Sequence, residues 1–298
     1  MPRRPNRLEE TQLAHDRVPH VRTVADLRAA VRAWRSNGET VALVPTMGAL
    51  HEGHLSLARH GKSRCTRVVA SIFVNPTQFA PTEDFSSYPR TFDDDLAKLA
   101  AVDCDLVWAP TADVMYPNGF ATMIVPEGAA EGLETDFRPH FFRGVATVCC
   151  KLFTQVGADI AVFGEKDYQQ LRVVTQMARD LDLPIEIVGR PTVRERDGLA
   201  MSSRNAYLSD DERQIAVAMH KALDNVASAV RAGGDIEAIC AAQSQTLLDA
   251  GFRSVDYLTV RDADTLKPTI TGARPETLRA LAAAWLGKTR LIDNIACA

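Results

Sequence analysis

The chain has 298 residues, of which 46% are hydrophobic and 24% are charged, and its formal net charge is −4. This balance is typical of a folded globular protein, and the length exceeds that of most single cores, so we expect two domains. The small negative charge argues against general attraction to nucleic acid or to acidic membranes. We expect neither as a partner.

Residues 1–20, "MPRRPNRLEETQLAHDRVPH", contain basic side chains but no apolar segment of a signal peptide, so we interpret them as an N-terminal extension. No apolar run approaches the roughly eighteen residues of a membrane helix. The six cysteines lack CxxC spacing. We expect them to be reduced thiols in a cytoplasmic protein.

Residues 21–190 alternate between helical and strand-like patterns. The segment "TVADLRAAVRAWRSNG" places Val24, Leu27, Val31 and Trp34 three and four residues apart, which predicts an amphipathic helix that ends at Gly38. Helix-like segments then separate apolar runs rich in β-branched residues, which predict buried parallel strands. We therefore expect a Rossmann-like, doubly wound α/β domain. Its strands are "TVALVP", "RVVASIFVN", "DLVWAP", "DIAVFG" and "IEIVG".

The pattern changes after residue 190. Two helical stretches, "SDDERQIAVAMHKALDNVASAVRAG" and "DIEAICAAQSQTLLDAG", precede three short strand-like pieces, "SVDYLTVRD", "LRALAAAWLG" and "TRLIDNIA". Residues 191–298 are therefore expected to form a smaller α+β domain with an antiparallel sheet.

The segment "PTMGALHEGH" follows the first strand of the α/β domain, where open parallel sheets bind their ligands. Gly48 and Gly53 allow close backbone approach, and the helix that starts near His54 directs free amide groups at an anion. His51 and His54 can donate to phosphate oxygens without a metal. A zinc site needs a third ligand, and HEGH lacks the HExxH spacing.

Two further segments carry charges suited to phosphates. In "GEKD", Lys166 can neutralise a phosphate, and Asp167 can hold Mg²⁺ or a ribose hydroxyl. The alternative is a solvated helix start, with acidic side chains that complement the helix dipole. In "MSSR", two hydroxyl groups precede Arg204, although this is also the composition of an ordinary loop.

Gln78 and Gln170 each follow closely behind a predicted strand. Their amides can bind a neutral or hydroxylated organic substrate without supplying charge. Either glutamine can equally be a surface amide.

Taken together, these motifs resemble the AMP-forming pantoate–beta-alanine ligases of the HxGH nucleotidyltransferase superfamily. The resemblance implies that ATP and Mg²⁺ support condensation of (R)-pantoate with beta-alanine to pantothenate, AMP and pyrophosphate, through a pantoyl adenylate, in a homodimer. It rests on "PTMGALHEGH", "SIFVNPTQF", "YPRT", "GEKDYQQL", "DGLAMSSRN", "RDADTL" and "AAWLGKTRLIDN".

The resemblance also implies roles for individual residues. His54, His51, Lys166 and Arg204 are the implied catalytic residues, with His54 as a proton donor to the phosphates. Gln78 and Gln170 resemble the pantoate contacts, and Gln78 also the beta-alanine contact. From its own chemistry Asp167 is the candidate magnesium contact, with Mg²⁺ held mainly through the ATP phosphates. The implied ATP contacts are Met47, Gly48, Ala49, Leu50, His51, Glu52, Gly53, His54, Gly164, Glu165, Lys166, Asp167, Val193, Met201, Ser202, Ser203 and Arg204.

Two positions depart from the family pattern. In "RPHFFRGV", His140 stands one place early and Phe141 occupies the usual histidine position, and Arg190 stands where an apolar residue is usual.

Two alternatives to the ligase also remain. One is another HxGH nucleotidyltransferase that acts on a phosphate ester, and the other is a nucleotide-binding protein without turnover.

Overall fold

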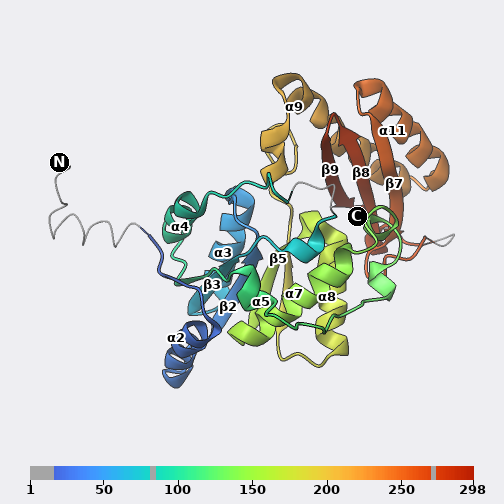
Figure 1. Ribbon diagram of the computed structural model, residues 1–298. Coiled ribbons are helices and arrows are strands. Elements are labelled where there is room, and N and C mark those ends of the chain that lie inside the picture. Colours follow the sequence, from blue (N-terminus) through green and yellow to red (C-terminus); the bar gives the residue numbers. More distant parts are fainter. Residues whose placement is uncertain (1–16, 81–84, 270–272) are drawn as a thin grey trace, which may run out of the picture. The chain divides into compact units, whose positions relative to one another are not determined.

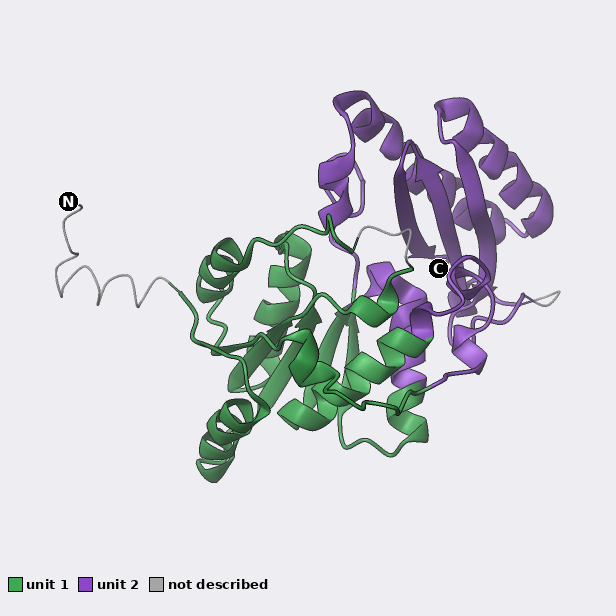
Figure 2. Cartoon of the chain, viewed as in Figure 1, with its two compact units in different colours: residues 1–124, 143–163, 177–190 green, residues 125–142, 164–176, 191–298 purple. Residues whose placement is uncertain are grey.

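The computed structural model of the chain describes residues 17–80, 85–269 and 273–298. The chain divides into two compact units (Figure 2). Unit 1 ends at residue 190, and two segments before that residue belong to unit 2. Unit 1 comprises residues 1–124, 143–163 and 177–190, and unit 2 comprises residues 125–142, 164–176 and 191–298.

The described part of the chain begins within the expected N-terminal extension. Residues 1–16 of that extension lie outside the described residues. Val18 is buried, and His20–Val21 form a short strand, β1, that pairs in parallel with β4 (Leu106–Trp108). The packed part of unit 1 therefore starts before residue 21.

The described part of unit 1 contains a six-stranded sheet in the order β1-β4-β3-β2-β5-β6. Figure 1 labels three of its strands, β3, β2 and β5. The pairs β1–β4, β3–β4, β2–β3 and β2–β5 are parallel, which confirms the doubly wound α/β prediction. From β2 the chain builds one side of the sheet and then returns to the other, so the switch point lies between β2 and β5. The remaining strands are β2 (Val41–Thr46), β3 (Arg67–Ile72), β5 (Ile160–Gly164) and β6 (Glu186–Arg190).

The first long helix shows how local signals set the helix ends. α2 (Val24–Ser36) is capped by Thr23, whose Oγ1 accepts from the backbone N–H of Asp26 at 3.1 Å. Leu27 and Val31 are buried on one face, as their spacing predicts. Helices of the described ranges are all too short or too polar to cross a membrane. Later elements include α3 (Glu52–Arg64), η1 (Pro76–Gln78), α4 (Phe92–Ala100), α5 (Ala112–Met115), η2 (Gly128–Ala130), α6 (Glu134–Phe137), α7 (Phe141–Val156), η3 (Glu165–Asp167) and α8 (Tyr168–Asp180).

The carboxy-terminal part of unit 2 packs helices on an antiparallel sheet in the order β7-β8-β9, which confirms the predicted α+β architecture. One predicted helix is divided at Val217 into α9 and α10. Ala280, Ala282 and Ala284 of β8 have no exposed surface, because their small side chains let helices pack closely on the sheet. The elements are η4 (Ser203–Tyr207), α9 (Asp210–Ala216), α10 (Ala218–Arg231), α11 (Ile236–Ala250), β7 (Ser254–Asp262), η5 (Pro275–Thr277), β8 (Leu278–Leu286) and β9 (Thr289–Ala296).

All six cysteines lie in the described residues as free thiols, and five of them are buried. Burial raises the pKa of Cys149 to about 12 and that of Cys104 to about 11, since a thiolate is poorly solvated there. We expect a thiol reagent to label the half-buried Cys150 first and the other five only on unfolding. Timed labelling with DTNB, followed by mass spectrometry, checks this order. Rapid labelling of Cys149 in the folded protein would contradict it.

Candidate active site

A buried carboxylate shapes the turn between β2 and α3. Gly48 and Ala49 adopt φ angles of 84° and 50°. Asp95 of α4 has 0% exposed surface and accepts from the backbone N–H groups of Ala49 at 2.9 Å and Leu50 at 2.8 Å. A Cβ at residue 48 would lie 3.2 Å from Asp95 Oδ2. Glycine therefore permits both the backbone angle and the close approach of the carboxylate.

His51 and His54 lie against one another at the start of α3. Their ring centroids are 4.1 Å apart, and the planes are inclined by 39°. The backbone N–H of His51 donates to His54 Nδ1 at 3.4 Å. A neutral His54 ring that accepts at Nδ1 carries its proton on Nε2. Nε2 is therefore the atom through which His54 can donate to an anion.

The N-terminus of α3 adds backbone donors to the two rings. The helix has 13 residues, and its start is attractive to anions, although the His54 N–H of the first turn donates to His51 O at 2.9 Å. Lys98 Nζ of α4 donates to Leu50 O at 2.9 Å. Two side chains of α4 therefore bond the main chain of Leu50: Asp95 bonds its N–H group and Lys98 bonds its carbonyl oxygen. The turn thus has a defined geometry before any ligand binds.

Gln78 belongs to a buried hydrogen-bonded group that follows β3. It ends η1 and is 8% exposed. Asn75 Nδ2 donates to Gln78 Oε1 at 2.9 Å, and Tyr116 Oη donates to Asn75 Oδ1 at 2.7 Å. Because the Gln78 oxygen accepts from Asn75, the group that Gln78 can offer a substrate is Nε2, a donor to a carboxylate or hydroxyl.

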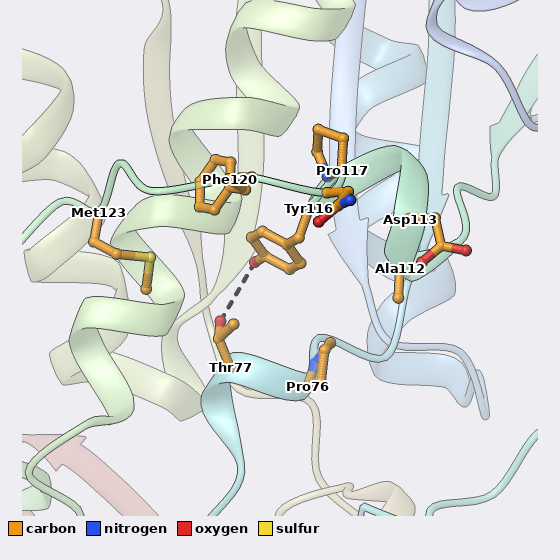
Figure 3. A pocket seen from close by; sticks show the side chains of 10 residues that line it. Pro76, Thr77, Ala112, Asp113, Tyr116, Pro117, Phe120 and Met123 are labelled. Atoms are coloured by element: carbon orange, nitrogen blue, oxygen red, sulfur yellow. Dashed lines mark hydrogen bonds between the residues drawn. The ribbon is translucent and has the colours of Figure 1, made fainter.

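A hollow of about 430 Å³ lies beside η1 in unit 1 (Figure 3). Figure 3 shows Thr77 and Tyr116 facing each other on its wall, and their hydroxyl groups are 3.3 Å apart. The wall combines apolar side chains such as Phe120 and Met123 with the carboxylate of Asp113. Its lining includes neither Gln78 nor the two histidines, so we assign no substrate to it.

In unit 2, the GEKD segment (residues 164–167) follows β5 and forms η3. Arg279 Nη2 of β8 donates to Glu165 Oε2 at 2.9 Å, so this carboxylate serves to hold the segment. Lys166 has a 19% exposed side chain, and its Nζ lies 3.9 Å from Asp167 Oδ2. Asp167 is 48% exposed. The Glu165 carboxylate, 27% exposed, is bonded to Arg279, whereas Lys166 and Asp167 are the other charged members of the segment and are also partly open to solvent.

Two adjacent glutamines at the start of α8 differ in their surroundings. Gln169 is 4% exposed, and its Oε1 accepts from the backbone N–H of Glu134 at 3.0 Å. Its Nε2 donates to Ala129 O at 3.1 Å. Gln170 is half-buried. Gln169 therefore fixes the loop before α7, which leaves Gln170 as the candidate for a ligand contact.

The MSSR hairpin (residues 193–204) brings together two predicted ATP contacts. The backbone N–H of Met201 donates to Val193 O at 3.0 Å. Ser202 Oγ accepts from the backbone N–H of Arg204 at 3.3 Å where η4 begins. Gly198 has a φ angle of 97°, and a Cβ there would lie 2.6 Å from Cδ2 of His220. Glycine thus allows the hairpin to rest on α10.

The described residues contain no group of three or more His, Cys, Asp or Glu side chains placed to hold a metal. Mg²⁺ usually keeps water ligands and binds through one or two carboxylates together with substrate phosphates. The 48% exposed carboxylate of Asp167 suits that mode of binding. The Asp167 carboxylate therefore fits a cation that arrives with ATP.

The two departures from the family pattern have different neighbours. The Arg138 guanidinium lies 3.9 Å from the ring centroid of Phe141, a cation–π contact at the start of α7. Arg190 ends β6. Burial first, and then the charge of Arg190, lowers the pKa of His60 on α3. Phe141 thus has a stabilising partner in Arg138, whereas the charge of Arg190 disfavours a protonated His60.

Several residues that shape the site do not stand out in the sequence. Asn75 orients Gln78, Asp95 shapes the histidine turn, and Arg279 holds Glu165. The only signal for Asp95 is the run of three aspartates at the start of α4, which exceeds what a helix dipole requires. The others need knowledge of contacts between distant segments.

The chain matches the family model described as pantoate-beta-alanine ligase over residues 19–296. It is 61% identical over 282 residues to a pantothenate synthetase of Bradyrhizobium sp. strain BTAi1, covering 94% of this chain and 99% of the relative. It is 57% identical over 277 residues to a pantothenate synthetase of Caulobacter vibrioides, covering 93% of this chain and 97% of the relative.

Solved structures give the same result. A pantothenate synthetase from Thermus thermophilus is similar with a TM-score of 0.87 and 44% identity, covering 94% of this chain and 99% of that one. A pantoate-beta-alanine ligase from Francisella tularensis, solved in complex with beta-gamma ATP and beta-alanine, has a TM-score of 0.77 and 30% identity. That match covers 94% of this chain and 98% of the other.

Proposed function

This chain belongs to the pantoate-beta-alanine ligase family, and we propose which of its residues bind and activate the substrates. The reaction condenses (R)-pantoate with beta-alanine and uses ATP. Family membership favours this activity over transfer to a phosphate ester and over nucleotide binding without turnover. The observation that carries the assignment of residues is the histidine turn held by Asp95, with the rings of His51 and His54 side by side at the start of α3.

In the first step, a pantoate carboxylate oxygen attacks the α-phosphorus of ATP. The bond to the bridging oxygen breaks, pyrophosphate leaves, and pantoyl adenylate forms. The transition state gathers negative charge on phosphate oxygens, so positioned donors and cations lower its energy. We assign this stabilisation to His51, His54 and the amides of α3, together with Lys166 and Arg204. The side chain of Asp167 would contact the Mg²⁺ that accompanies ATP.

In the second step, the beta-alanine amine attacks the acyl carbon, and AMP leaves as the amide bond forms. This step needs no nucleophilic side chain, because the substrates supply both reacting groups. Gln78 Nε2 is assigned to pantoate and beta-alanine, and Gln170 to pantoate. The remaining ATP contacts are assigned to Met47–Gly53, Gly164, Glu165, Val193 and Met201–Ser203.

We also propose that the enzyme is a cytoplasmic homodimer. Both expectations come from resemblance to the family, whose reaction uses soluble metabolites. Light scattering of the purified full chain is expected to give twice the mass of the 298-residue chain. A monomer at assay concentration would overturn the dimer.

The adenylate step is tested by pantoate-dependent exchange of labelled pyrophosphate into ATP without beta-alanine. We expect exchange with pantoate and none without an acid substrate. If pantoate gives no exchange while another acid releases AMP, the assigned substrate is wrong.

Replacement of Gln78 by leucine tests its assignment. We expect the KM for pantoate to rise by about tenfold or more, because a site built to donate to a substrate oxygen loses that bond. The KM for ATP should change less than about twofold. Gln245→Leu on the exposed face of α11 is the control. Equal changes in both KM values would argue that Gln78 acts through folding alone.

A further inference from the structure

Two adjacent polar residues of β9, Asp293 and Asn294, are almost completely buried, with 4% and 3% exposed surface. They belong to the "TRLIDN" segment, to which the reaction described above assigns no role. Successive residues of a strand point to opposite faces, so the two side chains reach different neighbours. Burying two polar groups is costly unless each is well bonded, so their partners indicate what they do.

Asn294 holds the GEKD segment by its backbone. Its Nδ2 donates to Glu165 O at 2.9 Å and to Lys166 O at 2.8 Å. Its Oδ1 accepts from Arg279 Nε at 2.5 Å, which fixes the orientation of the amide. The Arg279 guanidinium lies 3.7 Å from the ring centroid of Tyr168 and also bonds Glu165. The carbonyl oxygens of Glu165 and Lys166 are thus both hydrogen-bonded to β9.

Asp293 holds the MSSR hairpin from the other face of β9. Its carboxylate accepts from Arg194 Nη1 at 2.6 Å and Nη2 at 2.9 Å, a two-point ion pair with planar geometry. Arg194 Nη1 also donates to Gly198 O at 3.0 Å, across the hairpin. The backbone N–H of Asn294 donates to Asp293 Oδ1 at 2.7 Å, which links the two side chains.

We propose that Asp293 and Asn294 are positioning residues that fix the GEKD segment and the MSSR hairpin for ATP. Asn294 acts through Lys166, and Asp293 acts through Arg204. Because neighbouring residues of one strand hold both segments, a fixed spacing between the two sets of phosphate donors is built into β9. This inference rests on the proposed assignment of Lys166 and Arg204 to ATP.

A double-mutant cycle on pyrophosphate exchange tests the Asn294 arm in the full-length enzyme. We expect Asn294→Ala to lower exchange by about 10- to 100-fold and to raise the KM for ATP rather than that for pantoate. In a Lys166→Ala background the same change should cost less than about twofold, because the group that it positions is gone. If the two effects multiply in full, Asn294 does not act through Lys166.

If Lys166→Ala itself leaves exchange unchanged, the assignment of Lys166 to ATP fails. If Lys166→Ala lowers exchange but the two effects multiply in full, only the positioning role of Asn294 fails. Should Asn294→Ala not fold, Arg279→Lys removes the Nε donor that orients the amide, and the cycle is repeated with it. Thr289→Ala, a buried position at the start of the same strand, is the control and should leave both KM values unchanged.

The Asp293 arm is tested in the same way with Asp293→Asn and Arg204→Ala. Asparagine keeps the size of Asp293 but cannot form the two-point ion pair with Arg194. We expect Asp293→Asn alone to raise the KM for ATP. In an Arg204→Ala background it should cause little further loss of pyrophosphate exchange. A higher KM for pantoate alone, or full additivity, would overturn this arm.

Discussion

The His54→Ala variant is expected to lose pyrophosphate exchange by about 10²- to 10³-fold, the loss usual for one donor at a charged transition state. His54 Nε2 carries the proton because Nδ1 accepts from the backbone N–H of His51. The side chain is half-buried and contributes little core volume. We therefore expect the free energy of unfolding to fall by less than about 1 kcal/mol.

Urea unfolding and exchange assays on the same samples separate the two effects. His60→Ala removes a second half-buried histidine from α3 and is the matched control. We expect it to retain exchange. Undiminished exchange in His54→Ala, or its loss in proportion to unfolded protein, would refute the role of His54.

Asp95→Asn is expected to reduce both stability and activity, although Asp95 is not assigned a contact with any substrate. The carboxylate has 0% exposed surface and accepts from Ala49, Leu50 and the Thr91 hydroxyl, the last at 3.2 Å. An asparagine NH₂ group would face a backbone N–H, leaving buried donors without acceptors. We expect unfolding to become easier by about 2–4 kcal/mol.

The same change should lower exchange by about 10²-fold, because the turn that carries the two histidines loses its anchor. Asp93→Asn is the control: this carboxylate is 72% exposed and bonds Arg17 at 2.8 Å on the surface. Circular dichroism melts and exchange rates check both variants. Normal exchange in Asp95→Asn would show that the turn keeps its shape without the carboxylate.

Much of the fold could be predicted because it depends on local patterns. The runs that form β2, β3 and β5 are continuous and apolar, and the spacing of Leu27 and Val31 marks the buried face of α2. Short elements are harder to predict from the sequence. The two-residue β1 and the four-residue α5 and α6 have too few residues to show a period, so no periodic signal precedes them.

Some residues of the candidate site are likewise marked by local sequence patterns, and others depend on contacts between distant segments. Glycines and paired histidines after a strand predict an anion site from sequence neighbours alone, so His51 and His54 could be proposed as candidates. The difference between Gln169 and Gln170 could not, because it depends on a loop 35 residues away that bonds one amide.

The sequence by itself determined the α/β and α+β architectures and the order of their main elements, and it singled out the segments that we propose carry the chemistry. Only the tertiary structure decided what holds those segments in place. Asp95 lies 45 residues from Leu50, and Asn294 lies 128 residues from Lys166. Such bonds form because folding brings buried donors next to acceptors that must be satisfied, and no local pattern records which distant residue supplies them.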